Sequence, residues 1–118
     1  MMIELLEQYR DIVNTWEIQA YDQDGTNFRL KAQIILCDES ILHIRQIMLG
    51  ESTFKYAYHW QNKNGDLLCR WDNAPHWPEI VSYPHHKHLL QGGTETVVYS
   101  FGGDLAMVLS EIHKFIIK

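Results

Sequence analysis

The sequence predicts an α+β fold: a five-stranded antiparallel meander sheet with a short N-terminal helix and a C-terminal helix packed on one face. Between residues 12 and 72, apolar and polar side chains alternate with a period of two, which is typical of strands with one buried face. Turn-forming tetrapeptides divide this region, and segments 3–9 and 104–117 have helical periodicity instead. A chain of 118 residues, 46% apolar and 21% charged, is expected to fold as one domain over residues 1–118.

A short helix is predicted over residues 3–9, where Ile3, Leu6 and Tyr9 fall on one helical face. The turn signals that follow are DQDG (22–25), CDES (37–40), LGES (49–52) and NKNG (62–65). They separate five predicted strands near residues 12–21, 27–36, 41–49, 52–61 and 66–72. Because these connections are short, neighbouring strands are expected to pair antiparallel.

The last predicted hairpin is specific enough to predict its register. If Asn64-Gly65 forms a two-residue type I′ turn, Lys63 faces Asp66. The pairs that follow are Tyr58 with Trp71, His59 with Arg70, and Trp60 with Cys69. Apolar side chains then oppose apolar ones and polar side chains oppose polar ones, as a sheet with one buried face requires.

The C-terminal segment 104–117 is predicted to be the helix that covers the apolar face of the sheet, a face that includes Trp16 and Ile18. Its apolar residues recur at helical spacing and are Leu105, Val108, Leu109, Ile112, Phe115 and Ile116. Asp104 is expected to cap this helix. The glycine-containing segments 91–96 and 101–103 are predicted to be flexible connectors without a chemical role.

The opposite face of the sheet is expected to be basic, although the chain carries a net charge of −5. Alternation places on it the cationic and histidine side chains Arg29, Lys31, His43, Arg45, Lys55, His59 and Arg70, together with two acids, Glu17 and Asp72. Such a face is either the ordinary polar side of an open sheet or a platform for the phosphates of RNA.

The stretch RWDNAPHWPEIVSYPHHKH, residues 70–88, contains all three prolines of the chain and four histidines: His76, His85, His86 and His88. Histidine can act as acid and as base in phosphodiester cleavage without a metal, while Arg70 and Lys87 can stabilise the charge on the phosphate. The alternative is a surface cluster in which Asp72 caps a turn and pairs with Arg70.

The segment PHHKH (84–88) allows a metal site as a further alternative. On an extended chain, His86 and His88 share a side and His85 faces the other way. Two imidazoles with His76 or Asp72 would give three ligands and an open position for water. There is no HExxH motif and no cysteine nearby, so no metal and no cofactor are predicted.

The block from residue 56 to residue 88 resembles the signature of the TumE-like toxin family. The matching elements are YxYHWQ (56–61), the turn centred on Asn-Gly, RWDNAPH (70–76), PE (78–79) and PHHKH (84–88). One difference is Trp77, which follows His76 where the family often has a second histidine. The resemblance implies the toxin of a toxin–antitoxin pair, cytoplasmic and bound by a cognate antitoxin, but it does not by itself supply a reaction.

The sequence therefore predicts a toxin that acts on RNA as a metal-independent endoribonuclease. The predicted catalytic residues are His59, Arg70, Asp72, His76, His85, His86 and His88. The predicted RNA contacts are Arg29, Lys31, His43, Arg45, Lys55 and Lys87. Two alternatives stay open: a non-catalytic module that docks a protein partner, and a metal-dependent nuclease that uses the histidine segment.

The expected compartment and partners follow from features of the whole chain. Its first residues, MMIELLEQYR, contain no apolar core of signal-peptide length, and no apolar run is long enough to span a membrane, so no membrane partner and a cytoplasmic location are expected. Cys37 and Cys69 are isolated, which indicates neither a disulfide framework nor a thiolate zinc site. The aromatic side of the sheet offers a homodimer contact as an alternative to coverage by the helices alone.

Overall fold

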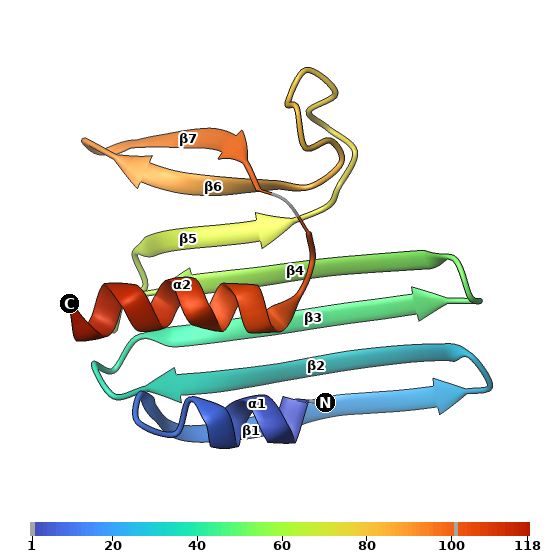
Figure 1. Cartoon of the computed structure of the whole chain (residues 1–118), viewed down its shortest axis with the longest axis horizontal. Coiled ribbons are helices and arrows are strands. Elements are labelled where there is room, and N and C mark those ends of the chain that lie inside the picture. The colour runs from blue at the N-terminus through green and yellow to red at the C-terminus, as the bar shows by residue number, and fades with distance from the viewer. Residues whose placement is uncertain (1, 101) are drawn as a thin grey trace.

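The computed structural model describes residues 2–100 and 102–118, and within them the chain forms seven strands and two helices (Figure 1). In chain order the elements are α1 (Met2–Gln8), β1 (Val13–Asp24), β2 (Asn27–Leu36), β3 (Ile41–Leu49), β4 (Thr53–Gln61), β5 (Leu67–Asp72), β6 (His86–Gln91), β7 (Thr94–Tyr99) and α2 (Leu105–Ile117). The strands lie in the sheet in the same order, and all neighbours are antiparallel. The predicted α+β meander is confirmed, but the predicted number of five strands is wrong.

The strands that the prediction missed are β6 and β7, which extend the meander beyond β5. Gly92 and Gly93 join them and have φ angles of 57° and 83°. A two-residue hairpin turn of this kind needs positive φ at both positions, which glycine adopts without strain. The segment 91–96 is therefore part of a hairpin and not a flexible connector. Residue 101 of the other predicted connector lies outside the described residues.

The predicted register between β4 and β5 is confirmed, with Tyr58 opposite Trp71, His59 opposite Arg70 and Trp60 opposite Cys69. The turn between these strands differs from the prediction.

This turn is longer than two residues because the side chain of Asn62 organises it. Asn62 Oδ1 accepts hydrogen bonds from the backbone N–H groups of Asn64 and Asp66. Gly65, at a φ of 89°, then takes the left-handed position before the strand resumes. A shift of the register between Trp60 and Gln61 absorbs the extra residue, as in a three-residue hairpin loop with a bulge.

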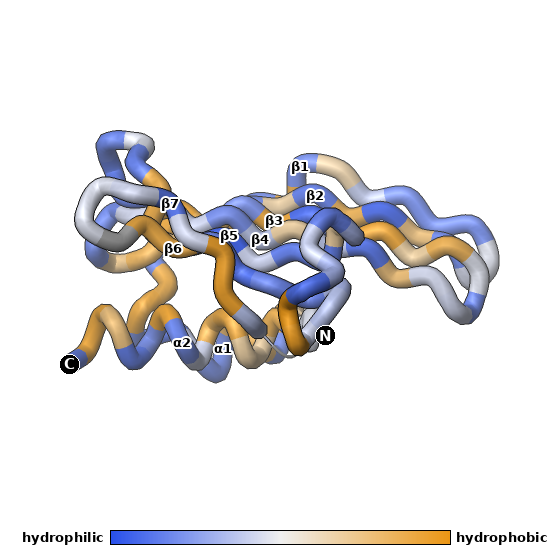
Figure 2. The backbone as a smooth tube through the Cα atoms, turned by 90° about the horizontal axis from the view of Figure 1, so that it is seen from above, coloured by the Kyte–Doolittle hydropathy of each residue, from blue (hydrophilic) through white to orange (hydrophobic). Residues whose placement is uncertain are grey.

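Both helices cover the same face of the sheet and leave the other face open (Figure 2). The fully buried side chains between sheet and helices include Ile34, Leu36, Leu42, Ile44, Tyr58, Trp71, Val108, Leu109 and Ile112. Asp104 caps α2 as predicted, since its side chain accepts a hydrogen bond from Ala106 N at 2.9 Å.

The edge strand β1 departs from the predicted core. Trp16 and Ile18 were expected in the covered face, yet they are 40% and 44% exposed. The physical reason is the length of the cover: α1 has seven residues, which span only about 10 Å at 1.5 Å per residue, whereas β1 has twelve.

The connector of residues 73–85 between β5 and β6 is held in place by a short series of turns. Ser82 is buried; its hydroxyl donates to the carbonyl of His85 and accepts from Ser100 N at 2.9 Å. These bonds fix where β6 begins, and therefore which residues of β6 lie opposite β5.

Among the described residues, neither helix is long and apolar enough to cross a membrane.

Candidate functional site

The strand registers align two rows of side chains across the open face of the sheet. One row, from β2 to β6, is Gln33, His43, His59, Arg70 and His88. The next row is Lys31, Arg45, Ala57, Asp72 and His86. In this second row Ala57 is the small side chain, so it leaves space on the open face between Arg45 and Asp72.

A cleft of about 490 Å³ opens at this place, bounded by β4, β5, β6 and the start of the connector. Its polar and aromatic lining consists of Lys55, Tyr56, Arg70, Asp72, Asn73, His76, Trp77, His86 and His88. Five of the seven predicted catalytic residues therefore lie around a single cleft.

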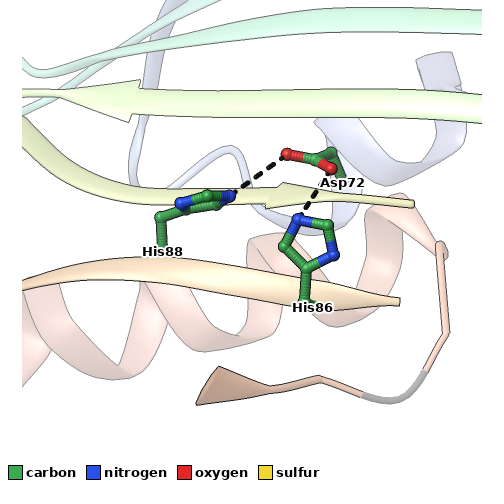
Figure 3. A group of neighbouring side chains, drawn as sticks. All are labelled: Asp72, His86 and His88. Atoms are coloured by element: carbon green, nitrogen blue, oxygen red, sulfur yellow. Dashed lines mark ion pairs between the residues drawn. The ribbon is translucent and has the colours of Figure 1, made fainter. Parts of the chain in front are cut away.

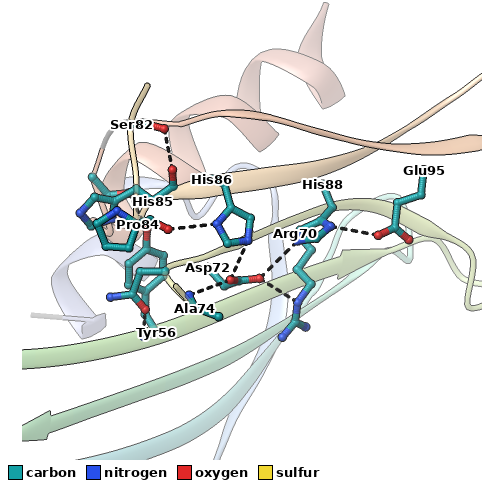
Figure 4. A network of polar contacts seen from close by, with 12 residues as sticks. Tyr56, Arg70, Asp72, Ala74, Ser82, Pro84, His85, His86, His88 and Glu95 are labelled. Carbon is teal, nitrogen blue, oxygen red and sulfur yellow. Dashed lines mark hydrogen bonds and ion pairs between the residues drawn. The ribbon is translucent and has the colours of Figure 1, made fainter. Parts of the chain in front are cut away.

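Asp72, the last residue of β5, is the centre of the polar network in this cleft (Figure 4). It is only 6% exposed. Arg70 Nε donates to its Oδ2 at 3.2 Å, and Ala74 N donates to its Oδ1 at 3.0 Å. The turn cap and the pairing with Arg70 that the sequence offered as an alternative are thus present, but the network extends further.

His86 and His88 complete the network from β6, and both turn Nε2 toward the carboxylate (Figure 3). His86 Nε2 lies 2.9 Å from Asp72 Oδ1, and His88 Nε2 lies 3.6 Å from Oδ2. The opposite nitrogens are also engaged: Nδ1 of His86 lies 3.0 Å from the carbonyl oxygen of Pro84, and Nδ1 of His88 lies 2.9 Å from Glu95 Oε2. The side chain of His86 is 2% exposed and that of His88 is 14% exposed.

Trp77 packs its ring near both imidazoles, with centroid separations of 6.4 Å to each. The two imidazole rings are themselves 5.0 Å apart in an edge-to-face arrangement. Neither Trp77 nor Glu95 was among the predicted site residues. Glu95 was missed because β7 was not predicted, although the alternation in TETVVY after the paired glycines was the signal that could have found it.

His59 lies on the open face between His43 and Arg70, with its ring centroid 6.1 Å from that of His43. Burial, the Arg70 guanidinium and the neighbouring His43 lower its pKa from 6.5. The ring is therefore neutral and able to accept a proton near neutral pH. His76 is exposed at the rim of the cleft beside Asp72, whose lining includes Arg70 but not His59.

His85 and Lys87 are placed on the other face of the sheet, away from this cluster. His85 Nδ1 lies 2.7 Å from Tyr56 Oη, whose own proton is donated to the carbonyl of Gly102 at 2.9 Å. Lys87 Nζ pairs with Glu111 of α2 at 3.4 Å. The predicted opposition of His85 to His86 and His88 is confirmed, and the predicted grouping of Lys87 with the cations of the open face is wrong.

Burial raises the pKa of several groups on the covered side and keeps them protonated. The pKa of Tyr58 rises to about 12, chiefly through burial, and that of Tyr56 rises further for the same reason. Burial also raises the pKa of the Cys69 thiol to about 12. This thiol is therefore a packing group and not a nucleophile.

The other predicted RNA contacts fall into two places on the open face. Arg29, Lys31 and Arg45 line a second hollow over β1–β3, of about 420 Å³, together with Asp22. Lys55 lines the cleft beside Asp72, and all four of these cations are exposed. The face is thus cationic from the hollow to the cleft.

Comparison with known proteins identifies a family for this chain. A sequence model of the family described as "Toxin TumE" matches residues 2–117. No curated protein and no solved structure is significantly similar to the chain. The match covers nearly the whole length, including the sheet, both helices and every residue of the Asp72 network, and the chain therefore belongs to the TumE toxin family.

Proposed function

We propose that this chain is the toxin of a toxin–antitoxin pair and that it cleaves RNA in the cleft beside Asp72. The observation that carries the proposal is that the cationic open face continues into a cleft where Arg70 pairs with a buried carboxylate, while the neutral His59 lies beside Arg70 on the neighbouring strand. The expected partners are a cognate antitoxin and RNA.

Binding of the RNA backbone is assigned to the exposed cations of the open face: Arg29, Lys31, Arg45 and Lys55. Arg and Lys neutralise phosphates, and their placement on one face compensates for the acidic charge of the chain as a whole. Long side chains on a sheet reach the backbone of a flexible single strand without contacts to particular bases, which supports a role in holding RNA across the cleft.

The proposed reaction is attack of a ribose 2′-oxygen on the adjacent phosphorus. A base removes the 2′-hydroxyl proton, the bond from phosphorus to the 5′-oxygen breaks, and an acid protonates that oxygen, which leaves a 2′,3′-cyclic phosphate. His59 is assigned as base because its lowered pKa keeps the ring neutral. His76, exposed at the rim, is assigned as acid, and Arg70 stabilises the charge on the phosphate.

His86 and His88 are given a different role from the one predicted. Both nitrogens of each ring already face a partner within the protein. An imidazole engaged at both nitrogens is poorly placed to exchange a proton with a substrate. We therefore assign them to holding Asp72 and the cleft in place, and assign proton transfer to His59 and His76.

The test is cleavage of a labelled single-stranded RNA by purified protein with His59→Ala, beside a matched variant, His113→Ala. His113 lies on α2, which covers the face of the sheet opposite the cleft, and it pairs with Asp11. Loss of a general base typically lowers the rate about 10²–10⁴-fold, so His59→Ala is expected to lose activity by that factor while His113→Ala keeps it. RNA left intact by the wild type, or equal rates for both variants, would contradict the proposal.

A further inference from the structure

Three donor atoms of the Asp72 network converge from β5 and β6 on one small volume. The imidazole nitrogens of His86 and His88 and the carboxylate of Asp72 all lie within 4.8 Å of one another (Figure 3). The two separations to the carboxylate are 2.9 Å and 3.6 Å, one to each oxygen. In a tetrahedral shell with bonds of about 2.0–2.1 Å, neighbouring donor atoms lie about 3.3 Å apart, so these separations fall on both sides of that value.

The second nitrogen of each ring decides which tautomer the site presents. Nδ1 of His86 faces the carbonyl oxygen of Pro84 and Nδ1 of His88 faces the carboxylate of Glu95, and both of these groups accept hydrogen bonds. Each Nδ1 therefore carries a hydrogen, and in the neutral ring each Nε2 presents a lone pair to Asp72. Contact of Nε2 with a carboxylate oxygen at this distance is favourable only when a positive species lies between them, either a second proton on the ring or a metal ion.

One cation between the three groups satisfies both imidazoles and the carboxylate together. Metal-binding histidines usually donate their other N–H to a backbone carbonyl or a carboxylate, which fixes the ring. Pro84 and Glu95 supply one partner of each kind. We propose that Asp72, His86 and His88 bind a divalent transition-metal cation of the Zn²⁺ class.

The donor set selects among cations. Imidazole nitrogens suit Zn²⁺ and its neighbours, whereas Mg²⁺ and Ca²⁺ prefer an all-oxygen shell. Three protein ligands leave a fourth position for water, and His86, His88 and Asp72 all line the cleft. Cation binding at this site does not depend on whether RNA is the substrate.

Arg70 opposes the cation, since its Nε lies 3.2 Å from Asp72 Oδ2 and its charge has the same sign. Its side chain is 40% exposed and is therefore free to turn toward solvent when a cation binds. Removing this charge while leaving the three ligands intact is expected to tighten binding. An ordinary surface ion-pair cluster would show no such gain.

The experiment is calorimetric titration of untagged, chelator-treated protein with Zn²⁺, and with Co²⁺ to follow its absorption spectrum. We expect one ion per chain and a tetrahedral Co²⁺ spectrum. His86→Ala and His88→Ala are each expected to lose binding, while His59→Ala, which removes a histidine of the same face, keeps it. Glu95→Gln leaves the ligands intact and is expected to weaken binding about 10–100-fold, and Arg70→Gln is expected to strengthen it.

Absence of binding in the wild type, or binding that survives both His86→Ala and His88→Ala, overturns the inference. If those two variants fail to fold, Glu95→Gln and Arg70→Gln decide: unchanged affinity in both overturns it. A wild type that binds Zn²⁺ but leaves RNA intact would contradict the proposed function alone, and one that cleaves RNA without binding the ion would contradict the cation site alone.

Discussion

At the scale of single residues, Asp72 is the group on which the candidate site depends. A buried carboxylate is unfavourable unless its oxygens are paired or hydrogen-bonded, and here Arg70, Ala74 and two imidazoles surround it. The same contacts place the Arg70 guanidinium, the turn at Ala74 and both histidines of β6 at fixed positions around one cleft. His59 lies outside this network, and its protonation can therefore be measured independently of the groups around Asp72.

The pKa of His59 is expected to respond to Arg70. Its value is lowered from 6.5 by burial, then by Arg70 and His43. Between the pKa of His59 in the folded chain and 6.5, the unfolded chain binds more protons than the folded one. The stability that the neutral His59 ring contributes is therefore fully present above pH 6.5 and is lost as the pH falls through the folded-state pKa. In an NMR titration with chelator present, the wild-type midpoint should lie below 6.5.

Arg70→Gln should move this midpoint upward because it removes a neighbouring positive charge. Lys63→Gln removes an exposed charge in the β4–β5 turn, where Lys63 pairs with Glu39, and should leave the midpoint unchanged. A wild-type midpoint at or above 6.5, or equal midpoints in Arg70→Gln and the wild type, would show that this account of His59 is wrong.

At the scale of elements, the β6–β7 hairpin supplies three side chains of the site, His86, His88 and Glu95, and strand pairing brings them to Asp72. Pairing of β6 with β5 puts His86 opposite Asp72 and His88 opposite Arg70. Pairing of β7 with β6 brings Glu95 within reach of His88. The turn at Gly92 and Gly93 therefore supports the site without touching it.

Substitution of Gly93 is expected to weaken this hairpin. Its φ is 83°, and an added Cβ would meet no other atom within 4 Å, so the strain is in the backbone alone. Gly93→Ala should lower the free energy of unfolding by about 1–2 kcal/mol. Gly93→Asn should lower it less, because asparagine enters the left-handed region more readily. Urea unfolding checks both, and an alanine variant as stable as the wild type would refute the expectation.

At the scale of the whole molecule, the two helices bury one face of the sheet and leave the other for the charges. Acidic residues lie mainly in the turns and on the helices, whereas Arg29, Lys31, Arg45 and Lys55 stand on the open strands. A net charge of −5 therefore does not prevent one face from attracting an anion.

The salt dependence of RNA binding should report on this face. Each phosphate contact in a single strand contributes about 0.7 to the slope of log affinity against log salt concentration. Arg45→Gln is expected to reduce the slope by about that amount. Lys114→Gln, on α2 and therefore on the covered side, is the matched control and should leave the slope unchanged. Equal slopes for the two variants would exclude the open face as the RNA platform.

The sequence by itself determined the parts of the structure that depend on neighbours in the chain. Alternation gave the strands from β1 to β5, and matching of faces gave the register of His59 with Arg70. The period of two also separated His85 from His86 and His88. Each of these features is local, because side-chain direction repeats along a strand and short turns fix the pairing of what they join.

Only the tertiary structure decided where β6 pairs. The connector of residues 73–85 is too long and irregular for a turn rule to set the register beyond it, and buried bonds of Ser82 fix that register instead. This non-local pairing turns histidines from one segment into partners of Asp72 from another, and Lys87, which alternates with them along β6, then lies on the opposite face. A convergence of side chains from separate strands depends on long-range contacts, which leave no periodic signal in the sequence.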